Sequence, residues 1–176
     1  MKVFAEFIRR GVTLENRGLA LKIQFIGIVA SAFVFVSLIL PWWTASLTGY
    51  GRGFFVNVYL YSPNVSMHDV QLTNSWVWLV FVLVVTCGLL GLAGSVGEKE
   101  INQKLLIGSG LLALLSLAIF VGGVQLLIIG NLVMGAPLAV YYSTSYDGFS
   151  YVLYLSYGFW LALAAAILMF FASTKA

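Results

Sequence analysis

Four long runs of apolar residues alternate with more polar segments along the chain. Each run has about twenty residues or more and almost no charge, which is the length that an α-helix needs to cross about 30 Å of hydrocarbon. The pattern predicts an all-α transmembrane four-helix bundle. The expected spans are residues 23–43, 76–95, 105–133 and 149–172.

The segment between the first two spans, residues 44–75, is polar and aromatic and predicts a small antiparallel β-sheet. Two runs of strand-forming residues, Phe54–Tyr61 and Val65–Leu72, flank a short stretch that contains Pro63, a residue that favours turns. We therefore expect a β-hairpin. A change of phase at His68 in the second run predicts a bulge there.

Alternation along the first strand places Phe55, Tyr59 and Tyr61 on its outward face, opposite apolar side chains that must be covered. Aromatic side chains often dominate protein interfaces, so we expect these three to contact a partner. The alternative is that they rest on the bilayer surface. In the second outer loop, residues 134–148, Leu138–Thr144 reads as a third strand that joins the hairpin, because two strands alone are marginally stable.

Small residues predict where the helices pack against one another. In the second span Gly88, Gly91 and Gly94 recur every three residues, and in the fourth span Ala162 and Ala166 are four residues apart. Lipid tails supply no hydrophobic drive for helix association, so small residues at these positions let two backbones approach closely.

Polar and aromatic residues within the spans leave two interpretations open. The amides of Gln125 and Asn131 either hydrogen-bond to a neighbouring helix or line a substrate route. The aromatic stripe that begins the fourth span, from Tyr151 to Trp160, either packs at the membrane interface or lines a slot for a quinone or sterol.

The composition lies outside the range of soluble domains, since 61% of the residues are hydrophobic, only 9% are charged, and the mean hydropathy is +1.01. The length fits one membrane domain, residues 1–176. The net charge of +3 does not indicate a nucleic-acid partner, because of the nine Lys and Arg residues only Arg52 lies in an outer loop. This bias predicts a multi-pass protein of the cell membrane with both termini cytoplasmic and the loop 44–75 extracellular.

Residues 1–21 predict a cytoplasmic amphipathic segment. Its apolar residues between Val3 and Gly11 follow one helical stripe, and Arg9 and Arg10 lie off it. The segment either docks onto anionic lipid or a partner subunit, or simply orients the first span.

The chain offers little for catalysis or metal binding. Cys87 is the single cysteine, so no disulfide forms within the chain, and His68 is the single histidine. His68 beside Asp69 resembles an acid–base pair but lacks a nucleophile or a second carboxylate. We expect no catalytic, cofactor-binding or metal site. Asn64 begins a glycosylation sequon at the predicted outward turn.

In order along the chain, Pro41-Trp42-Trp43 follows the first span, strands occupy a long first outer loop, and a short inner connection precedes a long third span and a shorter second outer loop. This arrangement resembles the claudin and peripheral myelin protein superfamily over almost the whole chain. In the first outer loop that family carries a glycine-leucine-tryptophan motif and two disulfide-bonded cysteines, where this chain has Gly51-Arg-Gly-Phe-Phe55 and no cysteine. The resemblance implies a protein whose outer lobe binds partners or itself.

Three functions are consistent with these features. Our first expectation is a non-enzymatic membrane protein whose outer sheet binds a partner or a second copy, and whose partners are membrane lipids, other membrane subunits or itself. The second is a small accessory subunit of a larger respiratory or transport assembly. The third is a lipid- or quinone-active enzyme. Because the spans lack acidic, basic and histidine residues, proton relays and ion-coupled pumps are disfavoured.

Overall fold

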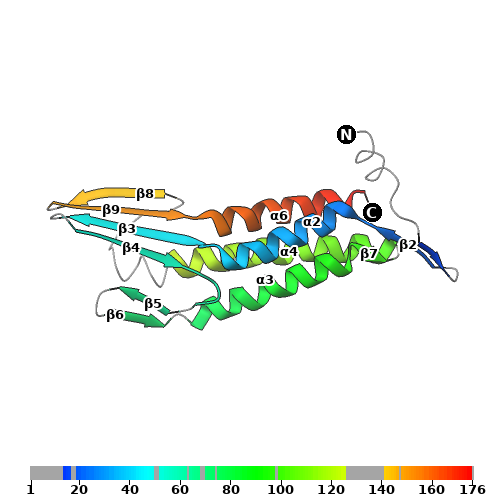
Figure 1. The fold of residues 1–176 in the computed structure, drawn as a ribbon, viewed down its shortest axis with the longest axis horizontal. Coiled ribbons are helices and arrows are strands. Elements are labelled where there is room, and N and C mark those ends of the chain that lie inside the picture. Colours follow the sequence, from blue (N-terminus) through cyan, green and yellow to red (C-terminus); the bar gives the residue numbers. More distant parts are fainter. Residues whose placement is uncertain are drawn as a thin grey trace.

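The structure, a computed structural model, describes residues 14–16, 19–49, 52–62, 64–67, 70–73, 75–97, 99–125, 141–146 and 148–175. Within these residues the protein is mostly helical, with four helices and a small antiparallel sheet at one end (Figure 1). The helices are α2 (Phe25–Ile39), α3 (Ser75–Ala93), α4 (Lys99–Gly123) and α6 (Tyr157–Ser173). The strands are β1 (Leu14–Asn16), β2 (Leu19–Ile23), β3 (Trp43–Gly49), β4 (Arg52–Val58), β5 (Asn64–Met67), β6 (Val70–Thr73), β7 (Val96–Gly97), β8 (Tyr141–Tyr146) and β9 (Phe149–Leu155).

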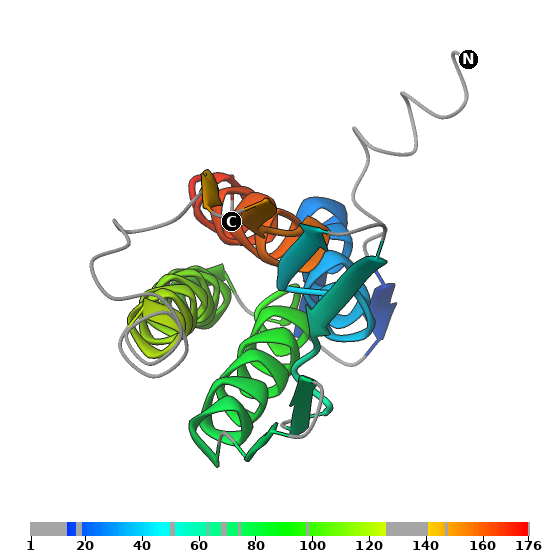
Figure 2. The same ribbon diagram turned by 90° about the vertical axis from the view of Figure 1, so that its left-hand side faces the viewer.

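The four helices form an antiparallel bundle in which each packs against two neighbours. Helix α2 contacts α3 and α6, and α4 also contacts α3 and α6 (Figure 2). We call the end of the bundle that carries β1, β2 and β7 the terminal end, because α6 also finishes there, and the opposite end the sheet end (Figure 1). The predicted four helices and small antiparallel sheet are therefore both present.

Two of the helices are long and apolar enough to cross a membrane. These are α3 and α4, whereas α2 has 15 residues and α6 has 17. The first and fourth spans were predicted too long. Residues 43–49 and 149–155, assigned to or beside those spans, are strands β3 and β9. A continuous apolar run has no periodicity that separates a buried strand from a helix, so the sequence pattern extended the helices into the strands.

The sheet has four antiparallel strands in the order β4-β3-β9-β8. Each half is a hairpin with two residues between the paired ends: Gly49 pairs with Arg52, and Tyr146 pairs with Phe149. Gly148 in the second connection has φ 79°, a left-handed conformation that glycine adopts without strain. The two hairpins join through β3 and β9, so the predicted union of the first and second outer segments in one sheet is present.

The predicted strand pairing was wrong in detail. Residues 54–58 pair with β3 rather than with 65–72, and β8 pairs with β9 rather than with the first hairpin. Gly49 is the last residue of β3, and Gly53 lies within β4. In β3, Trp43, Ala45 and Leu47 alternate with small polar residues, a local pattern typical of a strand.

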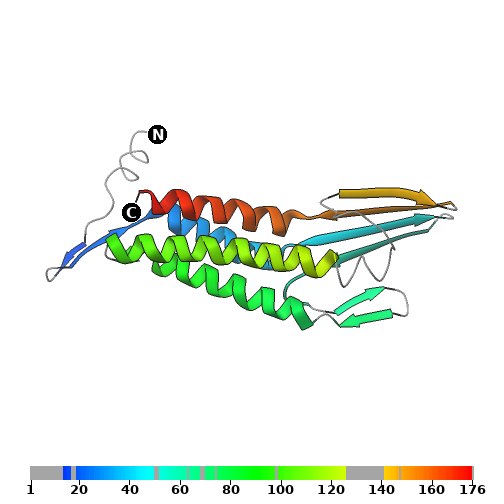
Figure 3. The same cartoon turned by 180° about the vertical axis from the view of Figure 1, so that it is seen from behind.

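The predicted return strand 65–72 is two strands. Residues 64–67 pair with 70–73 as a separate hairpin, so no bulge interrupts one strand at His68. This hairpin lies beside the four-stranded sheet at the same end of the molecule (Figure 3).

At the terminal end, part of the segment predicted as amphipathic forms β1 and β2, and β2 pairs with β7. Residues 1–13, which carry the predicted amphipathic stripe, lie outside the described residues, as do residues 126–133 of the third predicted span.

Candidate functional site

The sheet is attached directly to the ends of two helices. Strand β3 follows α2 after three residues, and β9 precedes α6 with only Ser156 between them. Backbone hydrogen bonds tie this junction together: the N–H of Ser156 donates to the carbonyl of Trp42 at 2.9 Å, and the N–H of Gly158 donates to the carbonyl of Pro41 at 2.9 Å. A side chain at Gly158 would collide with the Trp42 indole and the carbonyl of Leu40.

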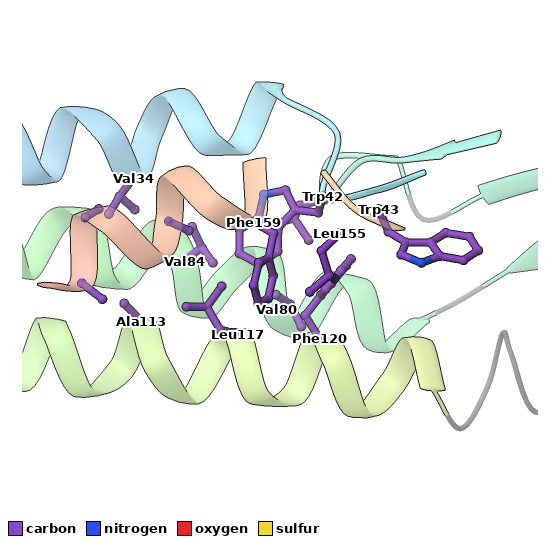
Figure 4. Packing of buried hydrophobic residues seen from close by; sticks show 14 of the residues in the cluster. Val34, Trp42, Trp43, Val80, Val84, Ala113, Leu117, Phe120, Leu155 and Phe159 are labelled. Carbon is purple, nitrogen blue, oxygen red and sulfur yellow. The ribbon is translucent and has the colours of Figure 1, made fainter. Parts of the chain in front are cut away.

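An aromatic cluster fills the bundle directly beneath the sheet. Trp42 is fully buried, its indole N–H donates to the carbonyl of Ser37 at 2.8 Å, and its ring meets the edges of Phe120 and Phe159 at centroid distances of 5.0 and 6.0 Å (Figure 4). The indole Nε1 of Trp43 is buried without a hydrogen-bond partner in the described structure, so that ring contributes by packing alone. The junction between helices and sheet is therefore built mainly of large apolar surfaces.

One face of the sheet is open, and we call it the open face. Its described exposed members come from three strands and none is charged. They are Thr48 of β3, Gly53, Phe55 and Asn57 of β4, and Tyr141, Ser143 and Ser145 of β8. Most of these side chains are small, whereas Phe55 is 73% exposed and Tyr141 is 67% exposed. The register aligns Phe55 with Ser46 and Val152, and Tyr141 with Tyr154 and Thr44. The two aromatic rings thus stand on the opposite edge strands of an uncharged platform.

The three aromatic residues that the sequence predicted as partner contacts do not form one group. Phe55 lies on the open face as expected, but β4 ends at Val58, and Tyr59 and Tyr61 belong to a turn closed by a bridge between Tyr59 and Ser62. The rings of Tyr59 and Tyr61 are 5.1 Å apart, and both residues follow the end of β4. The second exposed aromatic residue of the open face is instead Tyr141, on the opposite edge strand β8. The alternation of Tyr141, Ser143 and Ser145 was the signal that identifies it.

The small residues predicted for helix packing all lie inside the bundle. A Cβ atom at Gly91 would lie 2.5 Å from the Ser31 hydroxyl and 2.7 Å from the Met169 methyl group. Gly88 faces the Phe35 ring, with 2.7 Å between such a Cβ and Cζ, and Gly94 faces the backbone of α4. Ala162 and Ala166 of α6 are 3% and 0% exposed. Helix α3 and the residue after it therefore approach α2 and α4 closely through glycines, and Gly91 also faces the Met169 side chain of α6.

Two glycines of α4 have a different environment. A Cβ atom at Gly108 or Gly122 would have no atom within 4 Å. Gly108 lies on the outward side of the helix among Ile107, Leu111 and Leu115, which are 36%, 57% and 52% exposed. This side of α4 has room for another helix.

The interior holds a small sulfur and hydroxyl cluster. The Ser109 hydroxyl donates to the carbonyl of Cys87 at 2.7 Å and lies 2.9 Å from Sδ of Met169, which is 3.9 Å from Sγ of Cys87. All three side chains are fully buried and satisfied by one another. Among the described residues no group of three or more His, Cys, Asp or Glu side chains is placed to hold a metal ion.

Other predicted candidates fall partly or wholly outside the described residues. His68, Asp69 and Asn131 are among them. Asn64 is described as the first residue of β5, so the sequon begins a strand rather than occupying the tip of the predicted hairpin. Gln125 lies just after α4 and has an interaction partner.

No protein-family model matches the chain, and no curated protein is significantly similar to it.

Proposed function

We propose that this chain is a four-span integral membrane protein that uses the open face of its outer sheet to bind another protein or a second copy of itself, and that it is not an enzyme. The observation that carries the proposal is the open face: a rigidly attached, uncharged platform with two highly exposed aromatic rings. Aromatic side chains on a rigid support lose little conformational entropy on binding, which makes them effective interface anchors.

Insertion in a membrane is supported by the outer surface of the bundle. Only 33% of the residues in the apolar stretch of α3 and 39% in that of α4 are buried, unlike the core helices of a soluble protein. Between the charged first turns of α4 and the sheet end, the large exposed side chains on the four helices are apolar. They include Val36 and Ile39 of α2, Leu79, Val82 and Leu89 of α3, Leu111, Leu114 and Leu115 of α4, and Ile167 and Phe171 of α6. A continuous apolar surface of this extent needs lipid around it.

The charges support one orientation. Lys22, Lys99, Lys104 and Lys175 belong to elements at the terminal end, and Arg52 lies at the tip of the β3–β4 hairpin (Figure 1). Helices α2, α3 and α6, and α4 from Leu105 onward, contain no charged residue. We therefore propose that the terminal end faces the cytoplasm and the sheet faces outward, in the cell membrane.

The resemblance to the claudin and peripheral myelin protein superfamily is consistent with this proposal. In both, strands in the two outer segments accompany a four-helix plan. We propose the likeness at the level of architecture, since the first outer loop of this chain has no cysteine pair to brace it. Here the hydrogen bonds at Pro41 and Trp42 and the pairing of β3 with β9 hold the lobe in place.

The orientation is tested with single cysteines in a Cys87→Ala background. Ser145 and Gln103 are both exposed, whereas the neighbouring Asn102 is 1% exposed and unsuitable. An impermeant maleimide should label Ser145→Cys in intact cells and Gln103→Cys only after permeabilisation. Labelling of Gln103→Cys in intact cells would overturn the orientation, and recovery of both variants in the soluble fraction would overturn membrane insertion.

The binding role is tested by cross-linking in membranes followed by mass spectrometry. The double variant Phe55→Ser/Tyr141→Ser should lose its cross-linked partner or dimer, because both anchors are removed while the platform remains. Val96→Ser is the control, since Val96 is 47% exposed at the opposite end of the molecule. Full cross-linking in the double variant would refute the open face as the binding surface.

The alternative function, an accessory subunit of a larger membrane complex, is favoured by the open glycines of α4. If another chain packs there, Gly108→Leu/Gly122→Leu should release a foreign subunit while the isolated protein keeps its stability. Co-purification of foreign chains that depends on these glycines and not on Phe55 and Tyr141 favours this second function.

A further inference from the structure

We propose that the apolar belt, defined as the outward surface of the four helices between their two ends, is matched to a thin bilayer and binds short-chain phospholipids in preference to long-chain ones. This inference rests on the proposed insertion of the four helices into a membrane. It adds a lipid specificity that composition alone does not imply.

The lengths of the helices carry the first step. Helix α2 has 15 residues and α6 has 17, which correspond to about 22 and about 25 Å at 1.5 Å per residue. Helix α3, with 19 residues, reaches about 28 Å. The hydrocarbon core of a typical bilayer is about 30 Å thick, and any tilt shortens the reach of a helix further.

Side chains suited to the membrane interface lie at both ends of the belt and give a similar thickness. Trp160 and Trp78 are 46% and 47% exposed near the sheet end of α6 and α3, where an indole suits the headgroup region. Lys175 lies at the other end of α6, and the rise from Trp160 to Lys175 is about 22 Å. Extension of the lysine toward the headgroups adds only a few Å. The belt is therefore bounded on both sides at a separation below the usual thickness.

The base of the sheet explains why a thicker hydrocarbon layer fits poorly. Strand β8 is at an edge of the sheet, so one side of its backbone has no strand partner within that sheet, and its first residue, Tyr141, pairs near the base with Tyr154. Asn57, exposed and one residue from the end of β4, holds its amide oxygen 2.9 Å from the Thr44 hydroxyl. Hydrocarbon that rose to this level would desolvate an open strand edge and an exposed amide.

The test measures relative lipid binding by fluorescence. The protein is reconstituted into vesicles of brominated dioleoyl phosphatidylcholine, which quenches tryptophans at the lipid boundary, mixed with dimyristoleoyl, dioleoyl or dierucoyl phosphatidylcholine. Dimyristoleoyl lipid should bind about twofold more tightly than dioleoyl lipid, and dierucoyl lipid should bind most weakly. Equal binding of all three, or tightest binding of dioleoyl or dierucoyl lipid, would overturn the inference.

A variant that lengthens the belt sharpens the test. Gln103→Leu/Lys104→Leu adds two apolar side chains at exposed positions of α4 on the terminal side, so the discrimination against dierucoyl lipid should decrease. Ser143→Leu/Ser145→Leu makes similar changes on the open face and should leave the preference unchanged. Release of the wild-type protein from vesicles by alkaline carbonate is a separate outcome: it would refute membrane insertion itself, whereas carbonate-resistant protein without a chain-length preference would refute only the thin-bilayer match.

Discussion

The helical bundle and the outer sheet differ in how their inward and outward residues are distinguished. In the bundle both sides are apolar, and some inward positions are small where helices approach closely: Gly88, Gly91 and Ala166 are buried while Leu89 and Ile167 are exposed. In the sheet the inward side is apolar, as at Ala45 and Leu153, and the open face is mostly small and polar. Side-chain volume therefore limits which substitutions the close helix contacts tolerate. In the sheet, side-chain polarity distinguishes the open face from the buried face.

The largest loss of stability is expected where a substitution adds volume inside the bundle. Gly91→Leu should lower the free energy of unfolding by about 3 kcal/mol or more, because the new side chain meets Ser31, Met169 and Ser109 at once. Gly108→Leu is the matched control on a neighbouring helix and should change it by less than about 0.5 kcal/mol. Thermal unfolding in a mild detergent, followed by circular dichroism, measures both. Equal unfolding midpoints for the two variants would show that the inward or outward position of a glycine does not affect the cost of replacing it.

The second effect is at the junction between the two regions. Gly158→Ala should destabilise the protein by about 2 kcal/mol, because the added methyl group lies 2.8 Å from the carbonyl of Leu40 and collides with the Trp42 indole. Loss of the near-ultraviolet tryptophan signal before the loss of helical signal would show that the junction loosens first. Gly122→Ala, at an open position, should retain the wild-type curve in both signals.

A smaller effect is expected from one hydrogen bond beneath the sheet. Trp42→Phe keeps an aromatic ring but removes the N–H that donates to Ser37, so stability should decrease by about 1 to 2 kcal/mol. Trp78→Phe alters a half-exposed ring on the outside of α3 and should change stability by less than about 0.5 kcal/mol. A reversed order of the two midpoints would contradict the assignment of Trp42 to the core of the junction.

The smallest effect on stability is expected on the open face. Phe55→Ser/Tyr141→Ser should leave the unfolding midpoint nearly unchanged, within about 0.5 kcal/mol, because both rings are mostly exposed. Together with the cross-linking loss proposed above, this result separates binding from folding. A large drop in stability would instead mean that the two rings support the sheet, and the open face would lose its role as a docking surface.

The second predicted span, residues 76–95, was located to within about two residues of α3 because it is a long apolar run with polar residues at both ends. The ends of the first and fourth spans were not located, because apolar residues continue through Trp43 and from Phe149 into strands. Alternation in residues 43–49 indicates a strand, but its pairing with β9, about a hundred residues away in the sequence, is a contact that no local pattern encodes.

The candidate site, like the spans, was predicted only in part from the sequence. Alternation identified Phe55 as outward, in agreement with its exposed position. It failed at Tyr59 and Tyr61, because β4 stops at Val58 and the following turn ends the alternation. Tyr141 was assigned to a covering strand rather than to the open face, since its partner strand β9 had been read as helix.

Pairing of β3 with β9 also sets an order of events during synthesis. The register joins Trp43 to Leu155 and Gly49 to Phe149, so the loop between the paired strands spans most of the chain. Hairpins such as β3–β4 close locally and early, whereas β9 leaves the ribosome only after α2, α3 and α4. Until then one edge of β3 is without its partner and open to wrong pairing with other nascent chains. The arrival of α6 therefore completes both the bundle and the lobe in a single late step.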